Sequence, residues 1–404
     1  MNLFRCNPFL GATMAILIAA ASASPARAQT VKIGAVLELS GRFVSFGAHC
    51  QRGINMAAEA FGDTVAGRKY EFVFRDLQSE ARATVSAFTE MGNSGDINLV
   101  IGPTASPIAA AAMPSWQQTK PLWIEPGASS LDVQNLVGKE PMFFHTYPYG
   151  YHYHKSLAEA LKTALGGGKT IAVLYSDDAY GRSHLPAIKK YYKEAGFNVI
   201  TEESVRTNSP DMGPILTKVG RSKPDVLLGV MQTTDAITLA KQVRTLRLKI
   251  PYLVGTAATQ LIEWQQAVGD AQEGWLGIST YLPDTEDWPA DKTYPKLLPR
   301  TKAWEATFEA KYRTTPDYDD ATCYANAIQL LLAIDKAGTD NKEKVAEELR
   351  KQDLMTPMGR AHFEPSEDTL QQEFSDLIVF QRQSGKNVII YPAKAATGKL
   401  KALD

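Results

Sequence analysis

Short runs of β-branched and aromatic residues alternate along the chain with longer amphipathic stretches. This alternation is typical of parallel strands that are joined by crossover helices. The apolar runs predict strands in two successive series, the first at 31–37, 70–75, 99–102 and 122–125, and the second at 170–175, 198–202, 226–231, 252–254 and 275–280. Two series of this size predict an α/β protein with two doubly wound lobes.

The amphipathic stretches between these runs predict helices, at 50–61, 82–91, 108–118, 154–165, 185–195, 236–246, 304–312 and 321–337. Near the end of the chain, 374–380 and 387–391 predict two strands of a hairpin around the turn 383–386.

The order of the elements predicts that the chain passes between the lobes near residues 146, 279 and 363. We expect residues 29–146 and 280–362 to form the first lobe, and residues 147–279 and 363–404 to form the second. Several crossings of this kind act as a hinge. Ligands of α/β lobes bind beyond the carboxyl ends of the strands, so a site is expected in the cleft between the lobes.

Residues 1–28 have the pattern of a secretory signal. Arg5 provides a positive charge, 9–21 is apolar, and Ala26-Arg27-Ala28 forms an A-x-A cleavage site. The apolar stretch is shorter than the about 20 residues that a membrane span needs. No Cys follows it, so we expect a mature chain without a lipid anchor or membrane insertion, in an extracytoplasmic compartment.

The overall charge makes some partners improbable. The chain carries 43 Lys and Arg against 44 Asp and Glu, without a basic cluster, which speaks against nucleic acid and anionic membranes as partners. Loss of the signal removes Cys6 and leaves Cys50 and Cys323. An oxidising compartment permits these two to pair, and two buried free thiols are the alternative.

Small polar residues follow three strands of the first predicted lobe, at 39–47, 102–107 and 126–132. Ser106 followed by Pro107 matches a helix start, and a helix N-terminus can receive a carboxylate. Gly127 permits a close backbone approach, and Ser129 adds a hydroxyl. Each loop alone is consistent with a simple helix cap, but their common position at the strand ends predicts a shared binding site.

Enzyme motifs are weak by comparison. The segment 166–170 ends like a phosphate loop, but it follows a helix and precedes a strand, so a helix C-cap is the better interpretation. His152 and His154 have no carboxylate or third histidine nearby, so an aromatic helix start is the better interpretation than a metal pair. Asp177 and Asp178 likewise fit a helix cap better than catalytic carboxylates. We therefore expect no enzyme activity, no cofactor and no metal.

The segment 31–58, with Ser40-Gly41 and Gln51-Arg52-Gly53-Ile54, resembles the opening of the branched-chain amino acid binding family of ABC-transporter substrate-binding proteins, which have the type I periplasmic fold. The likeness extends over nearly the whole mature chain, through 73–76, 100–106, 124–129, 180–181, 224–226, 324–325 and 356–363. The resemblance implies a monomeric periplasmic receptor that closes on a small solute and passes it to a membrane permease.

The resemblance also implies which residues bind the ligand. On the first lobe it places the ligand's carboxylate and polar end at Ser106, Ser129 and the backbone of Gly127, with Phe46 as a wall of the cleft. On the second lobe, the positions of Tyr180, Gln232 and Ala257 correspond to ligand contacts.

The chain departs from the family pattern at the ligand's ammonium group. Leucine-type binders place an acid there, but 254–259 contains none, and Ala257 takes that position. A buried ammonium without a counter-charge is costly. The sequence thus predicts an aromatic or aliphatic acid without an ammonium as ligand. The alternatives are a branched-chain amino acid, with Asp235 as the counter-ion, a short amide or urea, and a sensor that uses the same fold.

Overall fold

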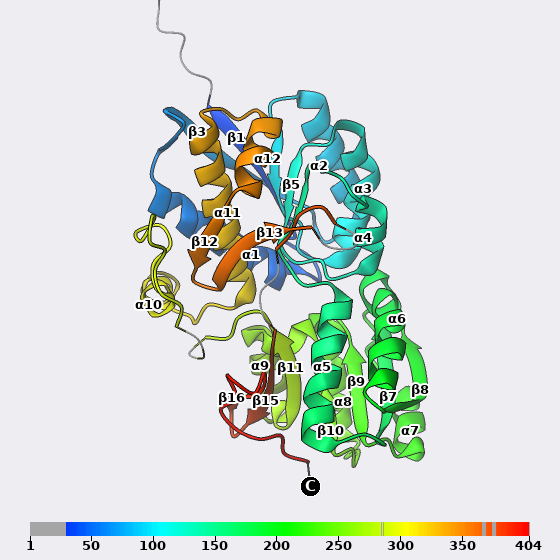
Figure 1. The fold of residues 1–404 in the computed structure, drawn as a ribbon. Coiled ribbons are helices and arrows are strands. Elements are labelled where there is room, and N and C mark those ends of the chain that lie inside the picture. The colour runs from blue at the N-terminus through cyan, green and yellow to red at the C-terminus, as the bar shows by residue number, and fades with distance from the viewer. Residues whose placement is uncertain (1–29, 284, 286, 366–368, 374–376, 404) are drawn as a thin grey trace, which may run out of the picture.

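A computed structural model describes residues 30–283, 285, 287–365, 369–373 and 377–403. In this part of the chain, two β-sheets are each flanked by helices and form two lobes stacked end to end (Figure 1). We call the part built on each sheet the first and the second lobe. The predicted signal at 1–28 lies outside the described residues.

The first sheet has nine strands among the described residues. Its central strands are parallel, because β1 pairs in parallel with both β3 and β4, and β5 pairs in parallel with β4 and β6. Across the sheet the order is β12 (Asp353–Thr356), β13 (Gly359–Glu364), β14 (Gln372–Glu373), β6 (Phe143–His145), β5 (Leu122–Glu125), β4 (Leu99–Ile101), β1 (Val31–Leu37), β3 (Arg68–Asp76) and β2 (Thr64–Val65).

The second sheet has seven described strands and carries the C-terminal hairpin at one edge. Its order is β16 (Lys386–Tyr391), β15 (Ile378–Gln383), β11 (Trp275–Ser279), β10 (Tyr252–Val254), β9 (Val226–Val230), β7 (Thr170–Ser176) and β8 (Asn198–Val205). The strands β7 to β11 are parallel, and β15 and β16 are antiparallel. This arrangement and the first sheet confirm the predicted α/β architecture of two doubly wound lobes.

Helices connect the parallel strands and cover the sheets. In the first lobe they are α1 (Val44–Phe61), α2 (Ala81–Ser94), α3 (Ser106–Thr119), α4 (Leu131–Val137), α10 (Thr301–Tyr312), α11 (Tyr318–Ala337) and α12 (Lys342–Arg350). In the second lobe they are α5 (Gly150–Leu165), α6 (Ala179–Glu194), α7 (Gly213–Ser222), α8 (Thr233–Thr245), α9 (Ile262–Val268) and the short 3₁₀ helices η1 (Ala257–Gln260) and η2 (Gly269–Gln272). No described helix is long and apolar enough to cross a membrane.

Two helices begin earlier in the sequence than predicted, one through a tertiary contact and one through a local cap. The helix α1 begins at Val44 rather than at residue 50, and no side chain of its own caps it. Instead, the Phe43 N–H donates to the Ser79 hydroxyl at 3.1 Å, from a loop distant in sequence. The helix α6 begins at Ala179 rather than at 185, because Asp178 accepts a hydrogen bond from the Gly181 N–H at 3.0 Å.

The last passage between the sheets lies later than predicted. The expected boundary at 362 falls inside β13, which pairs with β14 through Phe363 and Glu373. The strand β14 in turn pairs with β6, through Gln372 and His145. These two pairings hold the chain in the first sheet as far as Glu373, and β15 is the next described strand, in the second sheet. The predicted strand at 374–380 correspondingly begins at Ile378 among the described residues.

A disulfide links Cys50 and Cys323, which settles the alternative that the sequence left open. The bond joins α1 to α11, two helices that pack side by side (Figure 1). Both cysteines are fully buried in the core of the first lobe. The bond therefore ties the N-terminal segment of this lobe to the segment that returns to it after the second lobe.

A cavity between the lobes

All seven sequence-predicted binding residues line one cavity between the lobes, which is nearly filled by its own walls. The volume in which the centre of a water molecule can move is about 10 Å³, enough for about one water. The described lining is Phe46, Thr104, Ala105, Ser106, Gly127, Ser129 and Tyr318 from the first lobe, and Tyr180, Gln232 and Ala257 from the second. An organic solute can enter only if the walls move apart.

The hydroxyl of Ser106 is positioned to donate into the cavity. Ser106 is the first residue of α3, and its side-chain oxygen accepts a hydrogen bond from the Ser130 N–H at 3.2 Å. Because the oxygen is already an acceptor on that side, its own hydrogen remains available to a ligand. Ser129 offers a second hydroxyl, which lies 3.2 Å from Nε2 of His184 on the second lobe.

A buried glutamate already occupies the amides at the start of α3. The carboxylate of Glu38 accepts hydrogen bonds from the N–H groups of Thr104 at 3.2 Å and Ala105 at 2.9 Å. Burial raises the pKa of Glu38 to about 7, although these hydrogen bonds act in the opposite direction. The predicted capture of a ligand carboxylate at this helix end therefore depends on the Ser106 hydroxyl rather than on these amides.

The same holds for Gly127, whose predicted role needs correction. Its N–H donates to the buried carboxylate of Glu125 at 3.1 Å, so this backbone group is already used. Only glycine fits at this position, because a Cβ on Gly127 would lie 2.7 Å from the carbonyl oxygen of Thr104. Gly127 thus lets two loops of the lining approach each other, and Ser129 is the donor that its loop presents to the cavity.

The second-lobe wall is held together by Tyr180. Its hydroxyl donates to the Thr256 hydroxyl at 2.6 Å and accepts a long hydrogen bond from the Ala257 N–H at 3.5 Å. Burial raises the pKa of Tyr180 well above its ordinary value, so the phenol stays neutral. These bonds connect α6 to η1.

None of the ten described residues that line the cavity carries a charged side chain. Asp235, the alternative counter-ion for an ammonium, is buried outside this lining, and its carboxylate accepts a hydrogen bond from the Asn208 N–H at 2.8 Å. Burial raises the pKa of Asp235 to about 6. The Asp235 carboxylate is therefore hydrogen-bonded to a loop of its own lobe.

Besides the contact between Ser129 and His184, further contacts join the lobes around the cavity. The Ser130 hydroxyl donates to the Ala179 carbonyl at 3.0 Å, and Arg42 lies 3.7 Å from the carboxylate of Asp178. On α1, His49 lies 2.7 Å from Glu263 of α9. These contacts and the small cavity volume describe a closed arrangement of the lobes.

The residues considered for enzyme or metal chemistry have structural partners. Asp178 caps α6, as predicted. His152 and His154 do not share a site, since Nδ1 of His152 accepts from the Tyr149 N–H at 3.1 Å, whereas Nε2 of His154 lies 3.0 Å from His184. Gly166 ends α5, as expected for a C-cap.

One cluster of possible metal ligands occurs among the described residues, at His49, Asp317 and Asp320. In this cluster, Asp320 accepts two hydrogen bonds from Arg52, at 2.9 and 3.0 Å. His49 bonds Asp317 through Nδ1 and Glu263 through Nε2. The cluster is thus an ion-pair network between α1, the start of α11 and α9.

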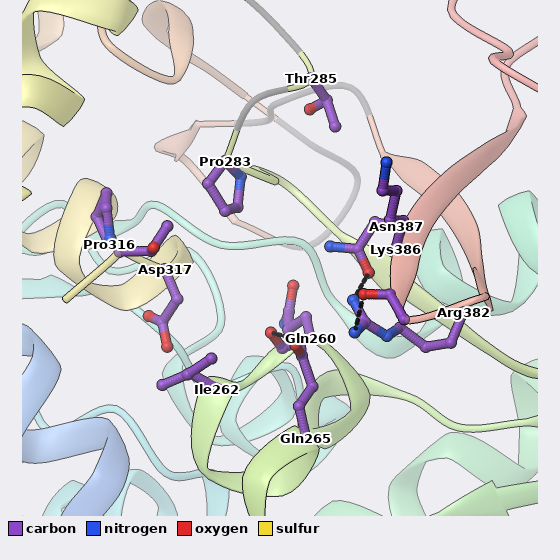
Figure 2. A pocket seen from close by; sticks show the side chains of 12 residues that line it. Gln260, Ile262, Gln265, Pro283, Thr285, Pro316, Asp317, Arg382, Lys386 and Asn387 are labelled. Atoms are coloured by element: carbon purple, nitrogen blue, oxygen red, sulfur yellow. Dashed lines mark hydrogen bonds between the residues drawn. The ribbon is translucent and has the colours of Figure 1, made fainter. Parts of the chain in front are cut away.

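A second and larger pocket, of about 470 Å³, opens beside the connections between the lobes. Figure 2 shows Pro316 and Asp317 on one side, Arg382 and Asn387 on the other, and Gln260 between them. The Arg382 guanidinium is already bound, to Gln272, Asn387 and the Gly385 carbonyl. None of the seven predicted binding residues lines this pocket.

Two α/β lobes with a closed, uncharged cavity between them are the architecture of a solute-binding protein. The sequence model of the periplasmic binding protein family matches residues 30–385, and the chain belongs to this family. Members of the family bind small solutes for ABC-type transport and are not enzymes.

Similar proteins cover nearly the whole chain. The leucine-, isoleucine-, valine-, threonine-, and alanine-binding protein of Pseudomonas aeruginosa is 24% identical over 370 residues, which are 89% of this chain and 93% of that protein. Leu/Ile/Val-binding protein homolog 7 of Brucella suis is 25% identical over 400 residues, which are 94% of this chain and 96% of that protein.

Solved structures show the same fold. A leucine binding protein from Thermotoga maritima superposes with a TM-score of 0.79 at 21% identity, covering 89% of this chain and 97% of that one. A solute binding protein from R. palustris in complex with benzoate gives a TM-score of 0.77 at 19% identity, with 93% and 98% covered. The fold therefore occurs with both amino acids and aromatic acids as ligands.

Proposed function

We propose that this protein captures a small carboxylic acid without an α-ammonium group between its lobes and presents it to the permease of an ABC-type importer. The site of action is the periplasm, with residues 1–28 as the export signal. The observation that carries this proposal is the uncharged lining of the cavity, with Ala257 at the position where the family pattern has an acid.

The polar groups of the lining suit a carboxylate better than an ammonium. Ser106 and Ser129 bring two hydroxyl donors to the first-lobe side of the cavity. A hydrogen bond to an ionised oxygen is stronger than one between neutral groups. An ammonium would instead be desolvated without an opposite charge, at a cost of several kcal/mol before relaxation.

The apolar groups of the lining suit a ring or a branched chain. Phe46 and Tyr318 face the cavity from the first lobe, and Tyr180 faces it from the second. All three rings are almost fully buried. Aromatic side chains contribute large apolar contact areas with defined orientations, which supports an aromatic or branched aliphatic acid as the solute.

Calorimetric titration with benzoate, 4-methylpentanoate, leucine and benzamide tests the proposal. We expect both plain acids to bind and leucine to bind more weakly than 4-methylpentanoate, its deaminated counterpart. The second candidate function is branched-chain amino acid binding, which the named relatives favour. Tighter binding of leucine than of both acids would establish that candidate instead, and binding of benzamide alone would establish an amide receptor.

A further inference from the structure

We propose that two histidines buried in the second lobe orient the Ser129 hydroxyl and thereby select an acceptor such as a carboxylate over a hydrogen-bond donor. This inference rests on the proposed function of the cavity. It assigns His184 and His154 as positioning residues that act on the ligand through Ser129.

The three residues form a continuous chain of polar atoms. Nε2 of His184 lies 3.2 Å from the Ser129 oxygen, and Nδ1 of the same ring lies 3.0 Å from Nε2 of His154. All three side chains are at most 1% exposed. This row of polar atoms runs from the cavity wall of the first lobe, through α6, to the interior side of α5.

Close packing fixes the central ring. A Cβ on Gly150, the first residue of α5, would lie 2.9 Å from both Cε1 and Nε2 of His184. The Gly150 N–H also donates to the Ser129 carbonyl at 2.7 Å, which holds the serine backbone next to the ring. On its other side, the His184 ring lies 4.5 Å from the Tyr180 ring, measured between centroids.

Burial makes both imidazoles neutral. It lowers the pKa of His184 to about 3 and that of His154 well below its ordinary value. Each ring then carries a single hydrogen. Two neutral rings and one hydroxyl can be linked by hydrogen bonds in only two directions along the chain.

In the first direction, Nε2–H of His154 donates to Nδ1 of His184, and Nε2–H of His184 donates to Ser129. The hydroxyl hydrogen of Ser129 is then free for the cavity. In the second direction, Ser129 donates to His184, which donates in turn to His154. Ser129 then presents only oxygen lone pairs to the cavity, and the hydrogen on His154 sits at Nδ1.

The surroundings of His154, at the end of the hydrogen-bond chain away from the cavity, discriminate between these directions. Nδ1 of His154 is buried and has no hydrogen-bond partner within the described residues. The second direction would leave an N–H donor unpaired in the interior, and buried unpaired N–H groups are rarer than buried acceptors that lack a donor. The first direction is therefore favoured, and it makes Ser129 a donor toward the ligand.

This direction has a consequence for specificity. Ser106 accepts from the Ser130 N–H and Ser129 accepts from His184, so both hydroxyls turn their hydrogens toward the cavity. A carboxylate accepts both hydrogen bonds. An ammonium or amide N–H would meet these hydrogens instead of lone pairs. Because His184 belongs to the second lobe, the orientation of Ser129 is fixed only when the lobes close.

Nitrogen NMR on the wild-type protein tests the direction without any ligand. The chain has six histidines, so ¹⁵N-labelled rings give a small set of signals, which single substitutions assign. We expect His154 and His184 to be neutral and protonated at Nε2. Protonation of either ring at Nδ1 would overturn the inference, whatever ligand the protein binds.

A mutant cycle with benzoate and benzamide as probes tests the effect on binding. We expect His184→Leu to weaken benzoate about tenfold, which corresponds to the loss of one hydrogen bond, and to weaken benzamide less. His184→Gln, whose amide can donate to Ser129, should restore most of the benzoate affinity. In the Ser129→Ala background, His184→Leu should have little further effect.

Three outcomes would each assign His184 a purely structural role. The first is an equal loss of affinity for benzoate and benzamide, and the second is no rescue of benzoate binding by His184→Gln. The third is the same tenfold loss when His184→Leu is made in the Ser129→Ala background. Failure of wild-type protein to bind benzoate would contradict the proposed function, while the NMR result would still decide the hydrogen-bond direction.

Discussion

His49 and Glu263 face each other across the boundary between the lobes, with Nε2 of the histidine 2.7 Å from the carboxylate. Burial by itself lowers the pKa of His49, but Asp317 on its other nitrogen, together with Glu263 and Asp320, raises it well above its ordinary value. The ring is thus a buried cation that bonds both lobes. This pairing joins the two lobes and therefore favours the closed arrangement.

Ligand should therefore shrink the molecule by shifting an equilibrium between open and closed lobes. We expect a smaller radius of gyration in small-angle scattering with saturating benzoate, at unchanged circular dichroism. Glu263→Gln, which removes the charge from the half-exposed partner, should shift the ligand-free protein toward the open form. Identical scattering with and without ligand at demonstrated saturation would argue against closure.

Ser129→Ala should weaken binding of a carboxylate ligand. Loss of a hydrogen bond to a charged group costs about 1.5–3 kcal/mol, or roughly 10- to 150-fold in affinity. Calorimetry measures this loss directly. Ser86→Ala, on the solvent side of α2, is the matched control and should leave the affinity unchanged. An unaltered dissociation constant in Ser129→Ala would remove this residue from the site.

Ala257→Asp should change the ligand preference from plain carboxylic acids to α-amino acids. The new carboxylate would lie in the cavity lining, where it can pair with an ammonium. We expect stronger leucine binding and weaker benzoate binding than in the wild type, compared in one calorimetric series. Asp235→Asn is the control, because this side chain bonds Asn208 outside the lining. A reversal of preference in Asp235→Asn rather than in Ala257→Asp would identify Asp235 as the counter-ion.

Acidification should destabilise the folded protein through His184. Burial holds the pKa of this ring at about 3, against 6.5 for a free histidine, so the folded state requires the neutral form. The contribution of His184 to the free energy of unfolding is complete above pH 6.5 and is lost as the pH falls toward 3. Urea unfolding between pH 5 and 8 measures the decline in stability, and His184→Gln should flatten it. The same decline in that variant would assign it to other groups.

Removal of the disulfide should destabilise the first lobe. The bond closes a loop between residues separated by 273 positions, and loss of a native disulfide typically costs about 2–5 kcal/mol. Urea unfolding of the double variant Cys50→Ala and Cys323→Ala should show this decrease in the free energy of unfolding. Reductant should lower the stability of the wild type but not that of the variant, and a stable reduced wild type would contradict the expectation.

The sequence was sufficient for most of the longer parallel strands and for the location of the cavity residues. Buried parallel strands are continuous apolar runs, so β1 and β5 have their predicted bounds. Residues after such strands gather at one edge of a sheet, and for this reason Ser106 and Ser129 line one cavity. Both inferences need only the local pattern and the rules of α/β topology.

Contacts between distant segments were not predictable in this way. The Glu38 carboxylate accepts a hydrogen bond from the N–H of Thr104, which lies 66 residues further along the chain. No local sequence pattern in either segment predicts this contact. The two-residue strand β14 is too short for any periodicity, so the final passage between the lobes was placed too early. Tyr318 lines the cavity from the start of α11 and follows none of the first-lobe strands whose ends predicted the binding site.

The pairing of β6 with β14 determines the order in which the molecule can be assembled. His145 precedes the whole parallel part of the second sheet, and its strand neighbour Gln372 follows it. A chain synthesised from its N-terminus therefore produces these strands of the second lobe before the edge of the first sheet is available. The first lobe is started first and completed last, and its exposed sheet edge remains uncovered during that interval.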